Sequence, residues 1–412
     1  MTQMPVSVVV VSRDRPAALR RCLAGLAQLQ YDPFEIVVVA DAKGCAVVAG
    51  SDWAEHIKTV PFEKPNISEA RNLGISHAAG DIVAFIDDDA VPEPSWLTQL
   101  IAPSVRPHVG AMGGFVLGRN GISHQWKART VDATGATEDL EMNPSRATVL
   151  TPKGARATKT EGTNMAVRRD VLVELGGFDP GFAFFLDETD LNLRLTRAGH
   201  ATAIVPLAEV HHGFAASPRR RADRVPRDLF DIGASWAVFQ RKYVPQTERI
   251  DHWRTLRAGE RARCVQHLMA GRLLPSDVRS LLRRLDQGYS QGLMRQRGGA
   301  VVSNSPNSAF KLFPFVPRKS VVLSGRIWEQ SRLRVEAVKR VKAGEIVTLI
   351  LLSPTALYHH VRFDHAGFWE QKGGLFGRSD RSEALFRTYA FSSRIEKERR
   401  RIAKQRLIKE VL

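Results

Sequence analysis

Short runs of apolar, mostly β-branched residues recur near the start of the chain, and polar residues follow each of them. Residues 6–11, 36–39 and 82–86 form three such runs. Runs that are apolar at every position predict strands buried on both faces of a parallel sheet. Residues 17–30 lie between the first two runs and predict a helix. The alternation of strands and helices predicts an α/β domain with three layers and a mostly parallel sheet.

Each predicted strand ends beside a polar side chain. Ser12 follows the first strand, Asp41 the second and Asp87 the third. Ligands of open parallel sheets bind beyond the carboxyl ends of the strands. We therefore expect a binding site where these three side chains meet.

The apolar pattern weakens after the third strand and returns later. Residues 119–159 are rich in Gly, Thr, Asn and charge, which predicts long loops over one face of the domain. Helices are expected at residues 168–175 and 188–198, and a strand at residues 201–205. From residue 218 the sequence changes to Pro-Arg-Arg-Arg, so we place the first domain at residues 1–215.

The second half of the chain is predicted to contain two further parts. Residues 216–302 form a basic helical region that ends in a linker. Residues 303–412 show strand, helix and strand patterns and then a basic helical tail, which predicts a smaller α/β unit. We recognise no family in this C-terminal part.

Charge is divided unevenly between the halves. The chain has a formal net charge of +17, yet residues 1–215 hold 20 Lys and Arg against 25 Asp and Glu. Residues 216–412 hold the other 40 basic and 18 acidic residues, a net charge of +22. The electrostatic field of so many basic residues attracts any anionic partner, so the charge alone does not show which kind of partner binds. We expect peripheral contact with an anionic membrane and no nucleic-acid partner, because the acidic half repels a polyanion.

Cysteine usage and hydropathy indicate the compartment. Cys22, Cys45 and Cys264 have neither the spacing of a zinc site nor the density of a disulfide framework. Eighteen consecutive apolar residues occur nowhere, and residues 1–5 lack the basic start of a signal peptide. The sequence therefore predicts a cytoplasmic protein, with membrane contact limited to the periphery of the inner face.

Three consecutive carboxylates, Asp87, Asp88 and Asp89, follow the third apolar strand. Like charges this close repel one another unless a cation offsets them. Mg²⁺ or Mn²⁺, held by carboxylates and substrate phosphates, suits such a turn. The structural alternative is a solvated turn in which Asp89 caps the following helix.

This strand and its acidic turn resemble the DxD motif of the family 2 glycosyltransferases. Six other segments resemble motifs of the same family in the same order, and the resemblance covers about residues 5–215. The six segments are residues 6–16 (first strand and nucleotide loop), 34–41 (second strand), 69–74 ("ARN-G" helix), 163–169 ("N-A-RR" segment), 175–179 and 187–195.

The resemblance implies a nucleotide-sugar-binding domain of the GT-A type, an inverting reaction and a UDP-, GDP- or dTDP-sugar donor. It implies that Asp41 contacts the base, that Asp87 meets the ribose and that Asp89 binds a metal ion bridging the diphosphate. The full set implied for donor binding is Ser12, Arg13, Arg15, Asp41, Arg71, Asp87, Asp88 and Asn164.

Two further positions extend the implied site. His211 or His212 lies where some family members place a third metal ligand, and we select His212. A structural histidine that has all its hydrogen bonds is the alternative. Asp187 and Glu188 open a predicted helix, whose dipole keeps carboxylates ionised as a general base requires. The family usually shows Glu-Asp here, so the order is swapped, and positional alignment favours Glu188.

These features favour an inverting glycosyltransferase that moves a sugar from a nucleotide-diphosphate sugar to a hydroxyl of a glycan or lipid-linked acceptor. The family implies polysaccharide or glycoconjugate synthesis. A sugar-phosphate nucleotidyltransferase is one alternative, although the chain lacks the glycine-rich basic first loop that suits that chemistry. A non-enzymatic protein that binds polyanions through its basic half is the other.

Overall fold

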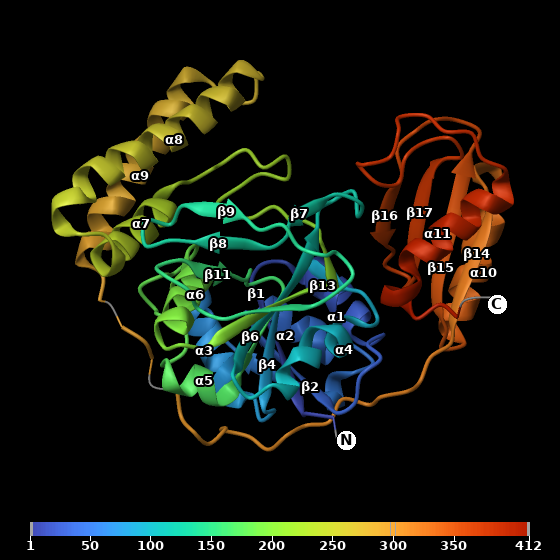
Figure 1. The fold of residues 1–412 in the computed structure, drawn as a ribbon, viewed down its shortest axis with the longest axis horizontal. Coiled ribbons are helices and arrows are strands. Elements are labelled where there is room, and N and C mark those ends of the chain that lie inside the picture. Colours follow the sequence, from blue (N-terminus) through green and yellow to red (C-terminus); the bar gives the residue numbers. More distant parts are fainter. Residues whose placement is uncertain (1–2, 297, 301, 410–412) are drawn as a thin grey trace.

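The computed structural model describes residues 3–296, 298–300 and 302–409. Its largest part is an N-terminal α/β domain that ends with β13 (Ala201–His212). A helical arm follows, made of α7 (Phe230–Tyr243), α8 (Arg249–Met269) and α9 (Pro275–Met294). A C-terminal unit lies on the other side of the N-terminal domain (Figure 1).

The main sheet of the N-terminal domain has ten strands. Its central path runs β10-β13-β6-β12-β4-β1-β2-β3, and β1 is parallel to both β2 and β4. Strand β12 is antiparallel to its neighbours β4 and β6 and joins the two parallel parts. The strands are β1 (Val6–Ser12), β2 (Phe34–Ala40), β3 (Ile57–Pro61), β4 (Ile82–Asp87), β5 (Ala90–Pro92), β6 (Val109–Leu117), β7 (His124–Trp126), β10 (Thr148–Leu150), β12 (Met165–Arg168) and β13.

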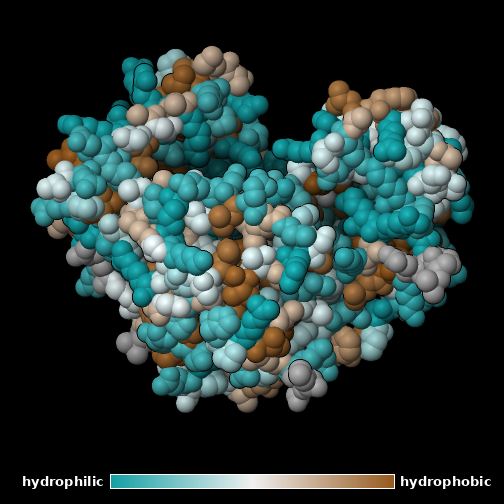
Figure 2. All heavy atoms as spheres, in the orientation of Figure 1, coloured by the Kyte–Doolittle hydropathy of each residue, from teal (hydrophilic) through white to brown (hydrophobic). Residues whose placement is uncertain are grey.

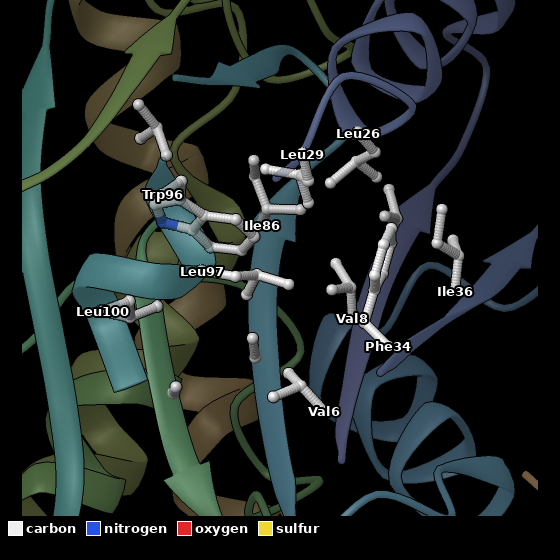
Figure 3. Packing of buried hydrophobic residues seen from close by; sticks show 14 of the residues in the cluster. Val6, Val8, Leu26, Leu29, Phe34, Ile36, Ile86, Trp96, Leu97 and Leu100 are labelled. Atoms are coloured by element: carbon white, nitrogen blue, oxygen red, sulfur yellow. The ribbon is translucent and has the colours of Figure 1, made fainter. Parts of the chain in front are cut away.

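Helices cover both faces of this sheet, as the apolar runs predict. Successive residues of β1 point to opposite faces, so Val8 enters one core and Val9 the other. Figure 3 shows the first core, in which Val8, Leu26 and Trp96 belong to one buried cluster and Trp96 lies beside Ile86. The helices of the domain are α1 (Pro16–Leu26), α2 (Ala42–Ala49), α3 (Ile67–His77), α4 (Trp96–Ile101), α5 (Arg169–Glu174) and α6 (Asp187–Arg197). The predicted three-layer α/β fold is confirmed.

The structure differs from the sequence prediction at residues 119–159. The segment expected to form loops contains β7 and β10 together with a small antiparallel sheet. That sheet has the order β11-β8-β9 and is built from β8 (Arg129–Val131), β9 (Thr137–Asp139) and β11 (Ala157–Lys159). Strands of three residues are too short to show a periodic pattern.

Strand β13 is also longer than predicted. It was expected to end at residue 205, but it continues to His212. Pro206 interrupts the apolar run, and the register against β6 shifts between Val205 and Glu209. Proline is tolerated at such an irregularity because the ladder is already broken there. The extension carries His211 and His212 to the same end of the sheet as the acidic turn.

Close contacts between helices hold the arm together. A Cβ atom at Gly288 would lie 1.9 Å from the carbonyl oxygen of Phe230, and one at Gly292 would lie 2.3 Å from that of Ala234. Glycine therefore lets α9 approach the backbone of α7. Helices α8 and α9 continue beyond this contact as a hairpin.

The C-terminal unit has a four-stranded sheet in the order β14-β15-β17-β16, with only β16 antiparallel. Its elements are β14 (Ser320–Arg326), α10 (Gln330–Lys342), β15 (Ile346–Ser353), β16 (His360–Phe363), β17 (Trp369–Gly374) and α11 (Phe391–Arg406). Residues 303–313, which we grouped with this unit, run along the N-terminal domain instead. Phe313 packs there against Phe34, with the ring centroids 5.2 Å apart.

A buried ion pair joins the C-terminal unit to the N-terminal domain. Two nitrogens of Arg406 in α11 donate to the two carboxylate oxygens of Glu93, each at 2.9 Å. Glu93 also contacts Nε2 of His211 at 2.8 Å, and the ring of Trp369 packs on both His211 and Arg406. Part of the basic tail, α11, therefore forms contacts within the protein. Within the described residues, no helix combines the length and apolarity that a membrane span requires.

Candidate active site

Two adjoining cavities lie at the carboxyl ends of β1 and β4. The larger has a volume of about 430 Å³, and Asp87, Asp89, Glu188, His212 and Trp236 are among its lining residues. The smaller, of about 120 Å³, is lined by the loop after β1 and by α3. Arg15 and Asp87 line both cavities, so the cavities meet at the acidic turn.

The three carboxylates of the acidic turn have different roles. Asp87 and Asp89 face the larger cavity, whereas Asp88 points into the protein. Asp88 accepts a hydrogen bond from Ser12 at 2.8 Å and lies 3.1 Å from Arg15. Burial raises the pKa of Asp88 to about 7, against the opposing charge of Arg15. Asp88 therefore supports the turn from inside the protein, and its predicted contact with the donor stays a prediction.

Asp89 is held in its ionised form. Burial alone would raise the pKa of this carboxyl, but the hydrogen bond and charge of His212 and the charge of Arg15 lower it well below its ordinary range. His212 Nε2 lies 3.2 Å from one oxygen of Asp89, and the backbone N–H of Ala215 donates to the other at 2.7 Å. The site thus offers a fixed negative charge beside an imidazole.

Asp87, Asp89 and His212 form a candidate metal site. One ligand atom from each lies within 4.8 Å of the others. Oε1 of Gln125 lies 2.9 Å from Nδ1 of His212, so Nδ1 can donate its proton to Gln125 while Nε2 faces Asp89. Without a metal ion, Nε2 can share a proton with Asp89 across 3.2 Å, and a divalent cation held by both residues would take the place of that proton. The geometry supports the predicted ligands Asp89 and His212 and adds Asp87, which we had expected at the ribose.

The larger cavity also contains two carboxylates at the start of α6. Asp187 is buried and forms an ion pair with Arg71, which also lies 3.4 Å from Asp87. Burial raises the pKa of Asp187 to about 8; Arg71 opposes the shift and the charge of Glu188 adds to it. Burial alone would also raise the pKa of Glu188, yet Lys159 and the hydrogen bond from Asp187 lower it below its ordinary value.

The backbone before α6 is strained. Phe185 has φ of 71° and Leu186 has φ of 65°, so two successive residues with side chains adopt the left-handed conformation. Such conformations persist only where the surroundings enforce them, and they are frequent at functional sites. They turn the start of α6 so that Glu188 lines the cavity.

Two other predicted donor-binding residues line neither cavity. Asn164 is fully buried: its Oδ1 accepts from the indole of Trp96 at 2.8 Å, and its Nδ2 donates to two backbone carbonyls. Asp41 accepts from the backbone N–H groups of Gly44 and Asp14, at 2.9 and 2.8 Å, and so caps α2 and fixes the loop after β1. Both side chains use oxygens within the protein, although the carboxylate of Asp41 has further lone pairs to offer, so the role of both residues in donor binding stays a prediction.

The structure adds Lys159, which sequence reasoning did not select, and brings to the cavity two aromatic residues, Phe185 and Trp236, that the sequence offers either for stacking on sugars or for core packing. Lys159 pairs with Glu161 at 2.9 Å and Glu188 at 3.4 Å from the small sheet that we had expected to be loops. Phe185 and Trp236 form an aromatic wall, with ring centroids 5.9 Å apart, and both line the larger cavity. No local pattern marks these residues, because distant segments bring them to the site.

The sequence matches the family model described as glycosyltransferase-like family 2 over residues 4–229. One relative is the O-antigen biosynthesis protein RfbC of Myxococcus xanthus, 29% identical over 57% of this chain and 19% of that protein. Another is the glucosyl-dolichyl phosphate glucuronosyltransferase of Haloferax volcanii, 29% identical over 43% of this chain and 56% of that protein. The chain thus spans only part of the length of either relative.

The chain is less similar to proteins of known structure. A mannosyltransferase from Pyrobaculum calidifontis, in complex with GDP-Man and Mn²⁺, is 17% identical, with a TM-score of 0.43 over 71% of this chain and 88% of that one. The family model covers more than half of the sequence and includes every motif that the resemblance rests on. The chain therefore belongs to the glycosyltransferase-like family 2.

Proposed function

We propose that this chain is an inverting, metal-dependent glycosyltransferase whose catalytic domain is the N-terminal α/β domain. One observation carries the proposal: the metal triad of Asp87, Asp89 and His212 shares a single cavity with the ionised carboxylate of Glu188. Displacement at an anomeric carbon needs a group that offsets the charge of the leaving diphosphate and a base for the acceptor. The cavity supplies candidates for both.

The donor fits across the two cavities. The smaller one, between the loop after β1 and α3, receives the nucleoside, and the diphosphate lies at the acidic turn with the sugar in the larger cavity. Arg15 lies 3.1 Å from Asp89, and it lines both cavities together with Arg220, so these two cations are available to that diphosphate. A divalent ion at the triad, when bound, supplies positive charge to the diphosphate oxygens as they leave.

Glu188 is the proposed general base. Its carboxylate takes the proton of the acceptor hydroxyl as that oxygen forms a bond to the anomeric carbon and the bond to the diphosphate breaks. The nucleotide diphosphate leaves from the opposite face of the sugar, which inverts the anomeric centre. Asp187 lines the same cavity, but it is paired with Arg71 and burial raises its pKa to about 8, whereas Lys159 lowers the pKa of Glu188 against its burial, which supports Glu188 as the base.

The wall of the larger cavity indicates a carbohydrate or lipid-linked acceptor. Phe185 and Trp236 present apolar ring surface beside the polar residues Arg129 and Thr137. Aromatic rings bind the apolar faces of sugars, while polar groups fix their hydroxyls. This supports a role in polysaccharide or glycoconjugate synthesis.

The metal preference follows from the ligands. His212 offers an imidazole nitrogen, whereas Mg²⁺ strongly prefers oxygen ligands. We therefore propose Mn²⁺ rather than Mg²⁺. Calorimetry with UDP, GDP and dTDP should show binding that needs Mn²⁺ and is weaker with Mg²⁺. Metal-independent binding of all three nucleotides would contradict the role of the triad.

The experiment that tests the base compares Glu188→Gln with Asp187→Asn. Glu188→Gln keeps the shape of the side chain, so it should bind Mn²⁺ and nucleotide like the parent while losing about 10² to 10⁴ in transfer rate. Asp187→Asn leaves Glu188 in place and should be the milder change in rate. A nearly unchanged rate for Glu188→Gln, together with loss of transfer in Asp187→Asn at equal donor affinity, would move the assignment to Asp187.

A further inference from the structure

The far end of the α8–α9 hairpin exposes apolar side chains. Residues 269–274, here called the hairpin tip, join the two helices through a turn at Gly271. The side chains of Met269 and Leu274 are 82% and 64% exposed on either side of this turn. Both side chains lie at the end of a projecting hairpin and are left largely uncovered by the described part of the chain.

Arginine surrounds these apolar residues. From residue 249 to residue 294 the hairpin holds nine arginines against four acidic residues. Arg254, Arg257, Arg263 and Arg284 are paired with carboxylates. Arg261, Arg272, Arg279 and Arg283 are exposed and have no carboxylate partner among the described residues. The hairpin therefore carries uncompensated positive charge up to its tip.

The C-terminal unit exposes a second apolar set. Residues 354–359 and 375–390, here called the C-terminal loops, follow the carboxyl ends of β15 and β17. Their exposed apolar side chains are Leu357 (65%), Tyr358 (53%), Leu385 (63%) and Phe386 (58%). Arg378, Arg381 and Arg387 lie in the same loops with Asp380 and Glu383, three basic against two acidic residues, a net charge of +1. The loops thus add exposed apolar side chains, while most of the positive charge of this face belongs to the hairpin.

Both sets lie on one side of the molecule. Figure 1 shows the hairpin and the C-terminal unit rising on either side of the N-terminal domain, beyond β7, β8 and β9, with the N-terminus on the opposite side. The hydroxyl of Ser320, at the start of β14, donates to the backbone carbonyl of Arg406 at the end of α11, so the C-terminal loops lie at the far end of the unit. Figure 2 shows the hollow between the two lobes.

The larger cavity lies below this hollow. Trp126 of β7 and Thr137 of β9 line the cavity, and both strands lie between the two lobes. Trp236 of α7 adds a contact from the base of the arm. A flat surface that touched both tips at once would face the entrance to the cavity.

We propose that this face docks on an anionic membrane surface, with the hairpin tip and the C-terminal loops as its two contacts. Exposed apolar side chains enter the headgroup boundary of a bilayer, and arginine is attracted to anionic lipid. Two contacts on one protein bind more tightly than either contact alone. Docking in this orientation presents a lipid-linked acceptor to the cavity, and this consequence alone rests on the proposed function.

Co-sedimentation with vesicles tests the proposal on the full chain. The vesicles contain about one-third phosphatidylglycerol in phosphatidylcholine, with pure phosphatidylcholine as the reference. The parent should sediment with the anionic vesicles and be released by salt. Met269→Glu/Leu274→Glu and Leu357→Glu/Phe386→Glu should each weaken vesicle binding about tenfold, and the four changes together should abolish it.

Val335→Glu is the matched control, because Val335 is 72% exposed on α10 and belongs to neither the hairpin tip nor the C-terminal loops. It should bind vesicles like the parent. Equal vesicle binding by the parent and both tip variants would overturn the proposal, as would binding to heparin without binding to vesicles. Binding of nucleotide with Mn²⁺ should be the same in all these variants. A failed vesicle test would therefore leave the proposed function intact, and a failed nucleotide test would leave the membrane docking intact.

Discussion

Replacing Arg406 should destabilise the contact between the C-terminal unit and the N-terminal domain. The side chains of Arg406 and Glu93 are 1% and 3% exposed, and two hydrogen bonds join them. Arg406→Met keeps much of the apolar stem but leaves the carboxylate of Glu93 buried beside His211 alone. A buried charge that loses its partner is destabilising by about 3–5 kcal/mol.

The pKa of Glu93 gives a second measure of the same interaction. Burial alone would raise this pKa, yet Arg406 and His211 lower it from 4.5 to about 2. A shift of this size corresponds to about 3 kcal/mol of folded-state stability. Because the folded-state pKa is the lower one, this stability is present above about pH 4.5 and is lost as the pH falls toward 2. Arg406→Met should therefore flatten the acid limb of the stability profile.

Hydrogen exchange of α11, read beside thermal unfolding, measures the effect at the interface. Arg406→Met should speed exchange in α11 by about 10²-fold and leave α7 unchanged. The double variant Glu93→Gln/Arg406→Met should be milder than Arg406→Met, because no charge remains buried without a partner. Unchanged exchange in α11, or a double variant less stable than the single one, would refute the reasoning.

Three further outcomes follow from contacts of the N-terminal domain. His212→Ala should weaken Mn²⁺ binding about tenfold or more, which a Mn²⁺ titration by electron paramagnetic resonance measures; unchanged affinity would remove His212 from the triad. Asn164→Ala should cost about 2–3 kcal/mol in urea unfolding, because the indole of Trp96 and two carbonyls lose their partner; the folded protein should still bind nucleotide. Gly114→Ala should be at least as destabilising, since its Cβ would lie 2.0 Å from the carbonyl oxygen of Ala208, and a parent-like unfolding curve would contradict that.

The apolar runs were sufficient to predict the central strands and the edge of the sheet that carries the site. Residues 6–11, 36–39 and 82–86 all fall inside β1, β2 and β4, because a strand buried on both faces must be apolar at every position. The family motifs then indicated the acidic turn, the start of α6 and the end of β13. Each of these signals is local in sequence.

Side-chain direction was harder to predict. Asp87, Asp88 and Asp89 look alike in sequence, but β4 ends at Asp87 and the other two lie in the turn that follows, and of the three only Asp87 and Asp89 line the cavity. The conformation of that turn, and the contacts of Asp88 with Ser12 and Arg15, have no signal in the sequence. The buried role of Asn164 was not available from the sequence either, because its partners Trp96 and Ala208 are 68 and 44 residues away.

The pair of Glu93 and Arg406 has a consequence for the history of the family. The two residues are 313 positions apart, so the acidic one is useful only to a chain that also carries the basic helix. A gene that lost the C-terminal unit would keep a buried carboxylate without its guanidinium, which selection should remove. Relatives without such a unit are therefore expected to carry a neutral residue in place of Glu93. Aligned relatives can test this expectation, and Glu in chains that lack the unit would show that the two parts evolved independently.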